Sequence, residues 1–369
     1  MYCILTCFLL VCLLCGRPAL VSQLPCDGAY MSRERTCMIN GIFIWIVFMS
    51  HMHSYLSSCA LWDRPFLKAV EYMGQTMVAT FFFFSGYGIM SSLKKKGLLY
   101  SRQLVTHRFF RLWLHFSIAV IVFATVQRCM GIHYEVESVL YALIAWTRIE
   151  NSNWFIFITL LSYLVIALNH RLLYRWGDTA MVGGIVAVFL VVMPFLLQLK
   201  GSYWVDSFLC IPAGMLFFIY QKHIESQVRK IPVPVWLLGV VLCFIGLMTY
   251  RVLPDSISFR LGEIVPCTPV MLVLVQNLGC VLFAVGVCML SAGMRYVSTP
   301  SFLVWSGGAA LFYLYIFQRI PMLMGKYWGI CEAYPMVYQI ACFIGTLLIA
   351  WGCCWIFPRV DFLIWRAKK

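Results

Sequence analysis

Long apolar runs separated by short polar intervals follow one another along almost the whole chain. Each run is about 20 residues long, which is the length of helix that crosses the hydrocarbon core of a bilayer. The runs lack the residue-by-residue alternation of barrel strands and are too long for buried strands. The pattern therefore predicts an all-α, polytopic transmembrane helix bundle of about ten spans, at residues 38–59, 72–92, 109–127, 154–170, 179–198, 204–221, 233–249, 269–291, 302–324 and 336–357.

Composition strengthens the membrane assignment. Hydrophobic residues make up 62% of the 369 residues, and charged residues make up only 11%. A soluble protein of this length could not hide so much apolar surface in one or two cores. No linker rich in Ser and Gly and no internal repeat marks a domain boundary, so residues 31–369 are expected to form one membrane domain in contact with the lipid bilayer.

Lys and Arg are distributed unevenly over the loops between the predicted spans. If residue 37 and the C-terminus lie in the cytoplasm, the inside segments carry about twice as many Lys and Arg as the outside segments. This bias follows the positive-inside rule across an even number of crossings, so both ends are expected to be cytoplasmic. The net charge of +14 then reflects loops that face an anionic leaflet, and no nucleic-acid partner is expected.

The first 30 residues do not fit this topology. Residues 2–15 form an apolar stretch that is too short to span comfortably and lacks the basic segment of a signal peptide. A cleaved signal would also invert every later loop against the charge bias. We therefore expect Met31 to be the physiological start, with an extra interfacial helix as the alternative for residues 1–30.

The 17 cysteines do not indicate a metal site. Many lie inside predicted spans, where they pack as small apolar residues. Cys12 and Cys15 have the spacing of metal ligands, but no His or carboxylate accompanies them. The chain also lacks a Gly-rich nucleotide loop, a His-Glu-x-x-His helix and a Gly-x-Ser-x-Gly elbow. Neither a metal nor a permanently bound cofactor is therefore expected.

The first span carries the main candidate for chemistry. His51 follows Asn40 by eleven residues, close to three helical turns, so both side chains share one face about 16 Å apart. Ionisable groups are costly in hydrocarbon, and their presence in a spanning helix usually indicates function. An imidazole can take a proton from a hydroxyl or carry an acyl group near neutral pH. His53 points to a different face, so only one of the two histidines is expected to face the bundle interior.

An aromatic wall closes the second span and is interrupted by small residues. Four phenylalanines at 81–84 are followed by Ser85, Gly86 and Tyr87. Small residues at such a position let neighbouring helix backbones approach closely. We therefore expect a tight helix crossing here.

Two arginines open the third span. Arg108 and Arg111 lie three residues apart, hence on one face of a helix, where guanidinium groups could hold phosphates. Ordinary positive-inside anchoring is the alternative. His115, one turn further on, is a second candidate on this side of the bundle.

Other polar positions lie at helix ends. Trp154 opens the fourth span, where an interfacial Trp is also expected on general grounds. The stretch 307–318 ends in Gln318, a hydrogen-bonding side chain inside the ninth span. Four acids could orient His51 or an incoming sugar, or could be solvated loop charges: Asp63, Glu71, Glu150 and Asp206.

In order and spacing these stretches resemble the motifs of the family-3 membrane acyltransferases, polytopic enzymes that O-acylate sugars and surface polysaccharides. The resemblance covers residues 31–369. It implies a multi-pass enzyme of the bacterial inner membrane that moves an acyl group, chiefly acetyl, from cytoplasmic acyl-CoA to a carbohydrate hydroxyl. Asn40 stands where the family usually has a basic residue, and Gln318 stands where a histidine is common.

The resemblance also implies roles for individual residues. His51 would act as a general base or as an acyl relay. The full set is catalysis by His51 and Asn40, binding of the acyl-CoA donor by Arg108, Arg111 and Ser85, and binding of the carbohydrate acceptor by Tyr87, Trp154 and Gln318. A transporter of sugar-linked units or small metabolites is the rival function, although the sequence lacks an inverted repeat and paired broken helices. A non-catalytic membrane scaffold, which would not need His51, is the third.

Overall fold

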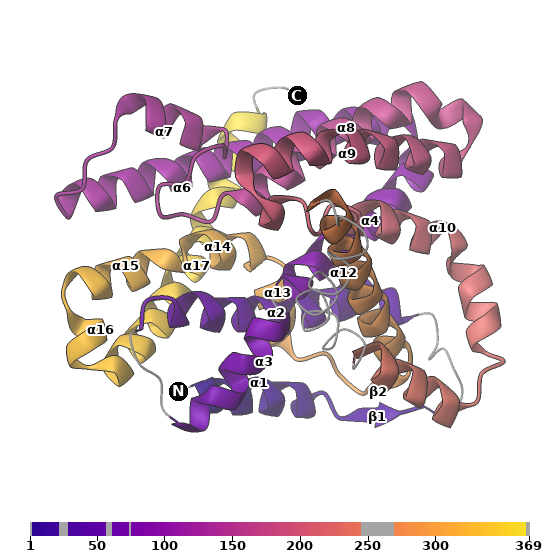
Figure 1. Cartoon of the computed structure of the whole chain (residues 1–369), viewed down its shortest axis with the longest axis horizontal. Coiled ribbons are helices and arrows are strands. Elements are labelled where there is room, and N and C mark those ends of the chain that lie inside the picture. Colours follow the sequence, from indigo (N-terminus) through magenta and orange to yellow (C-terminus); the bar gives the residue numbers. More distant parts are fainter. Residues whose placement is uncertain (1, 22–28, 57–60, 74, 245–268, 367–369) are drawn as a thin grey trace, which may run out of the picture.

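The computed structural model describes residues 2–21, 29–56, 61–73, 75–244 and 269–366, and almost all of them are helical (Figure 1). The first part of the chain contains α1 (Tyr2–Cys15), β1 (Pro18–Leu20), η1 (Ala29–Met31), α2 (Arg33–His53), η2 (Leu61–Asp63), α3 (Arg64–Met73), α4 (Thr76–Lys96), α5 (Leu98–Gln103), η3 (Leu104–Phe109), α6 (Phe110–Cys129), α7 (Val136–Leu143) and α8 (Trp154–Leu173). The second part contains η4 (Tyr174–Trp176), α9 (Asp178–Lys200), η5 (Ser202–Trp204), α10 (Cys210–Val228), a helix at Val233–Phe244, α12 (Pro269–Ala292), β2 (Met294–Tyr296), α13 (Ser301–Gly307), α14 (Leu311–Phe317), α15 (Arg319–Tyr327), α16 (Ile330–Ala333) and α17 (Pro335–Arg366). The all-α class predicted from the apolar runs is confirmed.

Seven of the described helices are long and apolar enough to cross a membrane, and one bent pair of helices would make an eighth. The chain is therefore a multi-pass membrane protein. Nine of the ten predicted runs each overlap mainly with one helix, the end of the run 233–249 lies outside the described residues, and the run 302–324 is divided among α13, α14 and α15. Two of the overlapping helices are not among the candidate spans. They are α10, which is polar in its second half, and Val233–Phe244, which is short as far as it is described. Ten spans and cytoplasmic ends stay predictions.

The helices are arranged so that α2, α12 and α13 lie in the middle of the molecule. Figure 1 shows α8 beside α9, with α6 next to them, along one edge. The opposite edge is formed by α1 and by β1, which pairs antiparallel with β2. The core therefore runs between the N-terminal segment and the α6–α8–α9 layer.

Glycines bring two pairs of helices into backbone contact. A Cβ atom on Gly86 of α4 would collide with the carbonyl oxygen of Ile211 in α10, as the small residues after the aromatic wall predicted. The same holds where α2 crosses α13, because a Cβ on Gly41 would collide with the Leu303 carbonyl and one on Gly307 with that of Cys37. In lipid the hydrophobic effect does not hold helices together, and close van der Waals packing of this kind stabilises their association instead.

The predicted span at 302–324 is not one straight helix. Ser301–Gly307 and the following segment Leu311–Tyr327 meet at an angle of 65°. The break falls in the run Gly307-Gly308-Ala309-Ala310, and α13 is held to α2 by a hydrogen bond of 3.0 Å from Trp45 Nε1 to Ser306 Oγ. The bend carries α14 and α15 past the end of α2, and this positions the site described below.

The N-terminal segment is packed against the rest of the molecule. Tyr2, Leu5 and Leu9 of α1 are buried, and the Tyr2 ring stacks on Phe66 with 5.8 Å between centroids. The other face of α1 exposes large apolar residues, which suits contact with lipid. The alternative given for residues 1–30, an extra interfacial helix, stays a prediction. A physiological start at Met31 stays a prediction.

Candidate functional site

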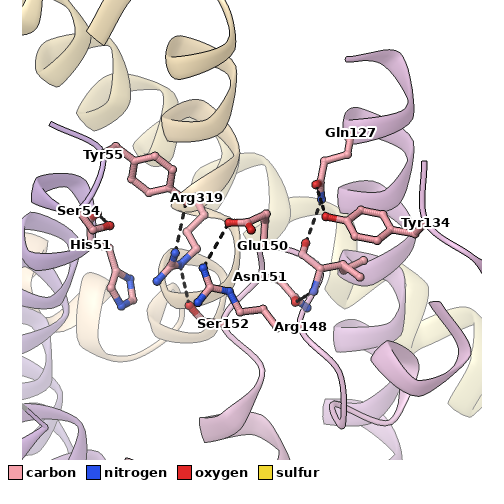
Figure 2. A network of polar contacts seen from close by, with 11 residues as sticks. His51, Ser54, Tyr55, Gln127, Tyr134, Arg148, Glu150, Asn151, Ser152 and Arg319 are labelled. Atoms are coloured by element: carbon pink, nitrogen blue, oxygen red, sulfur yellow. Dashed lines mark hydrogen bonds and ion pairs between the residues drawn. The ribbon is translucent and has the colours of Figure 1, made fainter. Parts of the chain in front are cut away.

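His51 lies in the last turn of α2 and faces the bent segment of the chain (Figure 2). Its ring lies 6.3 Å from the ring of Tyr315 in α14. The His51 Nδ1 atom is buried and has no hydrogen-bond partner among the described residues. Arg319 and Arg148 are close enough to interact with this imidazole electrostatically. A buried imidazole nitrogen therefore lies within electrostatic range of two guanidinium groups at one end of the bundle.

Arg319 connects three segments that are far apart in the sequence. It is the first residue of α15, and its Nε donates a hydrogen bond of 3.1 Å to Ser152 Oγ in the loop before α8. Its Nη1 donates one of 3.3 Å to the Tyr55 hydroxyl, just beyond α2. Figure 2 shows the guanidinium between His51 and Arg148. The partners of this cation are hydroxyl groups, and no carboxylate pairs with it among the described residues.

The loop between α7 and α8 supplies the other polar groups of the site. Arg148 forms an ion pair of 3.3 Å with Glu150, one of the four acids singled out in the sequence. Gln127 of α6 donates a hydrogen bond of 2.9 Å to the Ile149 carbonyl and accepts one of 2.6 Å from the Tyr134 hydroxyl. Burial raises the pKa of Tyr134, so its hydroxyl stays protonated and remains a donor. These bonds fix the loop against the end of α6.

Backbone strain in this loop is consistent with a functional role. Ala145 and Glu150 have φ values of 61° and 62°, in the left-handed region that side-chain-bearing residues rarely adopt. Such conformations cost about 1–3 kcal/mol each and persist only when surrounding contacts hold them. Here the Ala145 carbonyl accepts a hydrogen bond of 3.0 Å from Asn153, which anchors the loop to the start of α8.

Several buried polar atoms around Arg319 lack a partner. Besides His51 Nδ1, the Asn151 Nδ2 and Gln318 Oε1 atoms are buried and make no hydrogen bond within the described part of the chain. Gln318 is fully buried, and its Nε2 donates a hydrogen bond of 2.9 Å to the Tyr315 carbonyl. More than nine in ten buried polar groups in proteins are satisfied. A cluster of exceptions at one place indicates that a ligand or water completes the hydrogen bonding.

Asn40, the second predicted catalytic residue, lies where α2 crosses α13. It is buried, and its backbone touches Gly307. Its Oδ1 atom has no hydrogen-bond partner among the described residues. His53 faces elsewhere, with its ring 6.1 Å from that of Tyr2. The two rings thus contact different elements, but Nδ1 of His53 is buried as well. That only one of the two histidines faces the bundle interior stays a prediction.

The two arginines predicted to bind the donor do not act as a pair. Arg108 lies in η3, which is a π-helical segment, and its guanidinium sits 5.5 Å from the centre of the Tyr100 ring. Arg111 follows in α6 and pairs through Nε with Asp361 of α17 at 3.2 Å. The shared face assumed α-helical spacing, and the wider π-helical turn separates the two directions. The one-face prediction is therefore wrong, because the two side chains contact different elements.

Asp361 also binds the second candidate histidine. His115 Nε2 lies 3.0 Å from Asp361 Oδ1, and the imidazole is enclosed by aromatic rings, the nearest being Phe357 at 4.5 Å. Sequence reasoning missed Asp361. Asp361 lies just beyond the predicted span 336–357, where an unpaired carboxylate is costly. Its position at this end of the span was the signal that could have identified it.

A cavity of about 180 Å³ lies between the two ends of the bundle. Its lining includes Ser85 of the predicted donor set, the rings of Phe82 and Phe155, and two tyrosines, Tyr163 and Tyr315. Tyr163 lies beside Ser85 and Arg108, whereas Tyr315 lies beside His51. Along α6, Arg111 and Gln127 are about 24 Å apart, so the cavity occupies the interval between the arginine motif and the His51 site.

The predicted acceptor residues divide between two regions. Trp154 lies next to the cavity, with its ring 6.3 Å from that of Phe82. Tyr87 instead donates a hydrogen bond of 2.6 Å to Gln221 Oε1 in α10, and neither of these two lines the cavity. Of the remaining acids, Asp63 is buried in η2, Asp206 lies near Cys210, and the side chain of Glu71 is outside the described residues.

Arg319, Ser152 and Tyr55 were missed in the sequence, although a cation inside the predicted span 302–324 was a signal for Arg319. Chemically, the site offers a base or nucleophile, guanidinium donors and a neighbouring apolar cavity. Among the described residues no cluster of three or more His, Cys, Asp or Glu could hold a metal ion. Comparison of the chain with protein-family models, with curated proteins and with solved structures found no match.

Proposed function

We propose that this membrane protein is an O-acyltransferase that moves an acyl group, chiefly acetyl, from acyl-CoA to a hydroxyl of a carbohydrate or surface polysaccharide. The observation that carries the proposal is the buried, unpartnered nitrogen of His51 beside the Arg319 guanidinium. Transfer from a thioester to a hydroxyl needs a group that accepts the hydroxyl proton and a positive group that stabilises the oxyanion. His51 would fill the first role and Arg319 the second.

The donor would enter from the arginine motif. Arg108 has no ion pair recorded among the described residues, whereas Arg111 is engaged by Asp361, so Arg108 is the stronger candidate for the phosphates of coenzyme A. The cavity that contains Ser85 would take the reacting end of the pantetheine arm, with the thioester near Tyr315. Its aromatic lining would exclude water, which otherwise competes with the acceptor for the acyl group.

The acceptor would approach from the end of the bundle that holds His51. With both chain ends in the cytoplasm of a bacterium, this end faces outward from the inner membrane, and the arginine motif faces the cytoplasm. Trp154 and Gln318 lie close enough to the cavity and the His51 site to contact an acceptor. Tyr87 is turned toward α10 and is the weakest member of the acceptor set.

The proposal is tested with purified protein in lipid nanodiscs, acetyl-CoA labelled in the acetyl group, and a mixture of oligosaccharides as acceptors. We expect labelled ester to form with wild type, and the signal to vanish in His51→Ala. The matched control is His53→Ala, two residues away on the same helix and facing Tyr2 instead, which should keep most activity. A fully active His51→Ala protein would sink this mechanism.

The broken helix gives the transporter alternative one specific observation in its favour. Discontinuous helices frequently hold substrate in transporters, and α13 meets the following helix at 65°. A transporter would move sugar-linked substrates across proteoliposomes without acyl-CoA. Flux that is independent of acyl-CoA, together with no ester formation, would decide for transport.

A further inference from the structure

The charges around His51 point to the kind of acceptor. We propose that Arg319 and Arg148 form an anion-binding site beside His51 that holds a carboxylate or phosphate of the acceptor, so that the acceptor is an acidic carbohydrate. The choice of acceptor rests on the proposed function, whereas the anion site itself can be tested without it.

The Arg319 guanidinium has no acidic partner among the described residues. Buried or half-buried guanidinium groups in membrane proteins are normally paired with a carboxylate, because an unpaired charge in a low-dielectric setting is costly. Arg319 is half-buried, yet its recorded partners are the neutral hydroxyls of Ser152 and Tyr55. Glu150 is the acid recorded in this network, and it is bound to Arg148. The two guanidinium groups are therefore accompanied by one carboxylate in the described network, and it is paired with Arg148.

Several hydrogen-bond donors around Arg319 have no acceptor among the described residues. A guanidinium has five N–H groups, and the recorded hydrogen bonds of Arg319 use two of them. Asn151 adds a buried Nδ2 donor without a partner in the described residues. Lys326 adds positive charge beside Tyr55, with its Nζ 5.9 Å from the centre of that ring. A surplus of donors and positive charge matches an acidic group that only accepts hydrogen bonds.

Two further buried atoms without a partner in the described chain lie beside these donors. Gln318 Oε1 is buried and unpartnered in the described chain, and His51 Nδ1 is buried in the same state. An amide oxygen, and an imidazole nitrogen that carries no hydrogen, accept a hydrogen bond from a hydroxyl. Donors for an acid and acceptors for a hydroxyl therefore lie side by side, as binding of a sugar that carries both groups requires.

A second source of negative charge is the oxyanion of the transfer reaction, and kinetics separate the two sources. We compare matched oligosaccharides that contain either glucuronate or glucose, with acetyl-CoA as donor. In Arg319→Gln, kcat should fall for both acceptors, because the oxyanion loses its cation. The KM should rise about 10- to 100-fold for the glucuronate acceptor, which loses a charge-assisted hydrogen bond, and the KM for the glucose acceptor should stay the same. The control is Arg128→Gln, an exposed arginine at the end of α6, which should alter neither value.

A fall in kcat for both acceptors with both KM values unchanged would overturn the proposal and assign Arg319 to the oxyanion alone. Arg319→Lys keeps the charge but not the fork of donors, and it serves if the Gln variant elutes as misfolded protein. Lys should retain part of the preference for glucuronate, and no preference in wild type would also overturn the proposal.

Binding is measured separately in His51→Ala, which has no transfer activity under the proposed function. Glucuronate should raise the melting temperature of this variant in nanodiscs more than glucose does, and adding Arg319→Gln should remove the difference. If wild type transfers no acyl group but the glucuronate effect depends on Arg319, the anion site stands and the acyltransferase function falls. If glucuronate and glucose act alike, the anion site falls, whatever the enzyme does.

Discussion

The two histidine sites of this bundle, one around His51 and one around His115, contain similar residue types and differ in their hydrogen bonding. At the second site, one carboxylate oxygen of Asp361 lies 3.0 Å from His115 Nε2, and the other lies 3.2 Å from Arg111 Nε. At the first site, within the described part of the chain, a ring nitrogen is buried without a partner, and the hydrogen bonds of the nearby Arg319 go to hydroxyl groups. Both regions combine a histidine with an arginine, but among the described residues the polar groups satisfy one another only at the His115 site.

The difference separates packing from function. A histidine, a carboxylate and an arginine that satisfy one another fix α6 against α17 and leave little capacity for a ligand. Polar atoms that stay unsatisfied cost stability, and proteins keep such atoms where a substrate restores the hydrogen bonds. Residue type alone therefore does not distinguish the two sites, and neither does one unsatisfied nitrogen, because Nδ1 of His53 is also buried without a partner among the described residues. The neighbouring Arg319 and Arg148 set His51 apart.

The largest expected effect separates the two histidines by activity. His51→Ala should lower kcat for acyl transfer about 10²- to 10⁴-fold, because the proton acceptor is lost. His115→Ala should keep kcat within about threefold when the rate is expressed per folded molecule. The rates are compared in nanodiscs after size-exclusion chromatography. If His115→Ala loses kcat and His51→Ala does not, the assignment is reversed and the chemistry lies at the other end of the cavity.

The next effect concerns stability at the satisfied site. Asp361→Ala leaves His115 and the Arg111 guanidinium without their shared partner, so we expect a loss of about 3 kcal/mol in the free energy of unfolding. The Asn variant keeps a hydrogen-bond acceptor and should lose less. Denaturation in mixed detergent micelles measures both. If Asp361→Ala is as stable as wild type but slow in transfer, the cluster belongs to the active site.

A smaller effect concerns the two arginines of the donor motif. Arg108→Lys should raise the KM for acyl-CoA about tenfold, because a lysine cannot bind a phosphate bidentately. Arg111→Lys should leave this KM unchanged, since Arg111 is engaged by Asp361, and should lower stability slightly. Initial rates against acyl-CoA concentration distinguish the two variants. Equal KM values in both would reduce the motif to a membrane anchor.

Sequence reasoning predicted the helices well and their local geometry poorly. Apolar runs of about 20 residues decide where helices form, because nothing else satisfies the backbone in lipid. The same reasoning cannot detect a π-helical segment, so Arg108 and Arg111 were expected on one face although they contact different elements. Nor could it detect the 65° bend after Gly307, since a hydropathy pattern measures length but not direction.

The candidate site was predicted in part for a related reason. His51 stands out because an ionisable residue in an apolar helix is unusual on any reading. Its partners come from segments that are far apart in sequence, such as Tyr55, Ser152 and Arg319, and only the tertiary structure brings them together. Their residue types are ordinary for loops and helix ends, so no local pattern marked them.

The smallest expected effect on activity comes from removing the N-terminal segment. A chain that begins at Met31 keeps Arg33 and Arg35, which orient α2, so it should insert and transfer acyl groups at close to the normal rate. It loses the stacking of Tyr2 on Phe66 and the pairing of β1 with β2, so its melting temperature should fall by several degrees. Activity and thermal denaturation of both chains, in the same lipid, test this pair of expectations. Loss of activity at unchanged melting temperature would link α1 to the His51 end of α2, which it reaches through the contact between Tyr2 and His53.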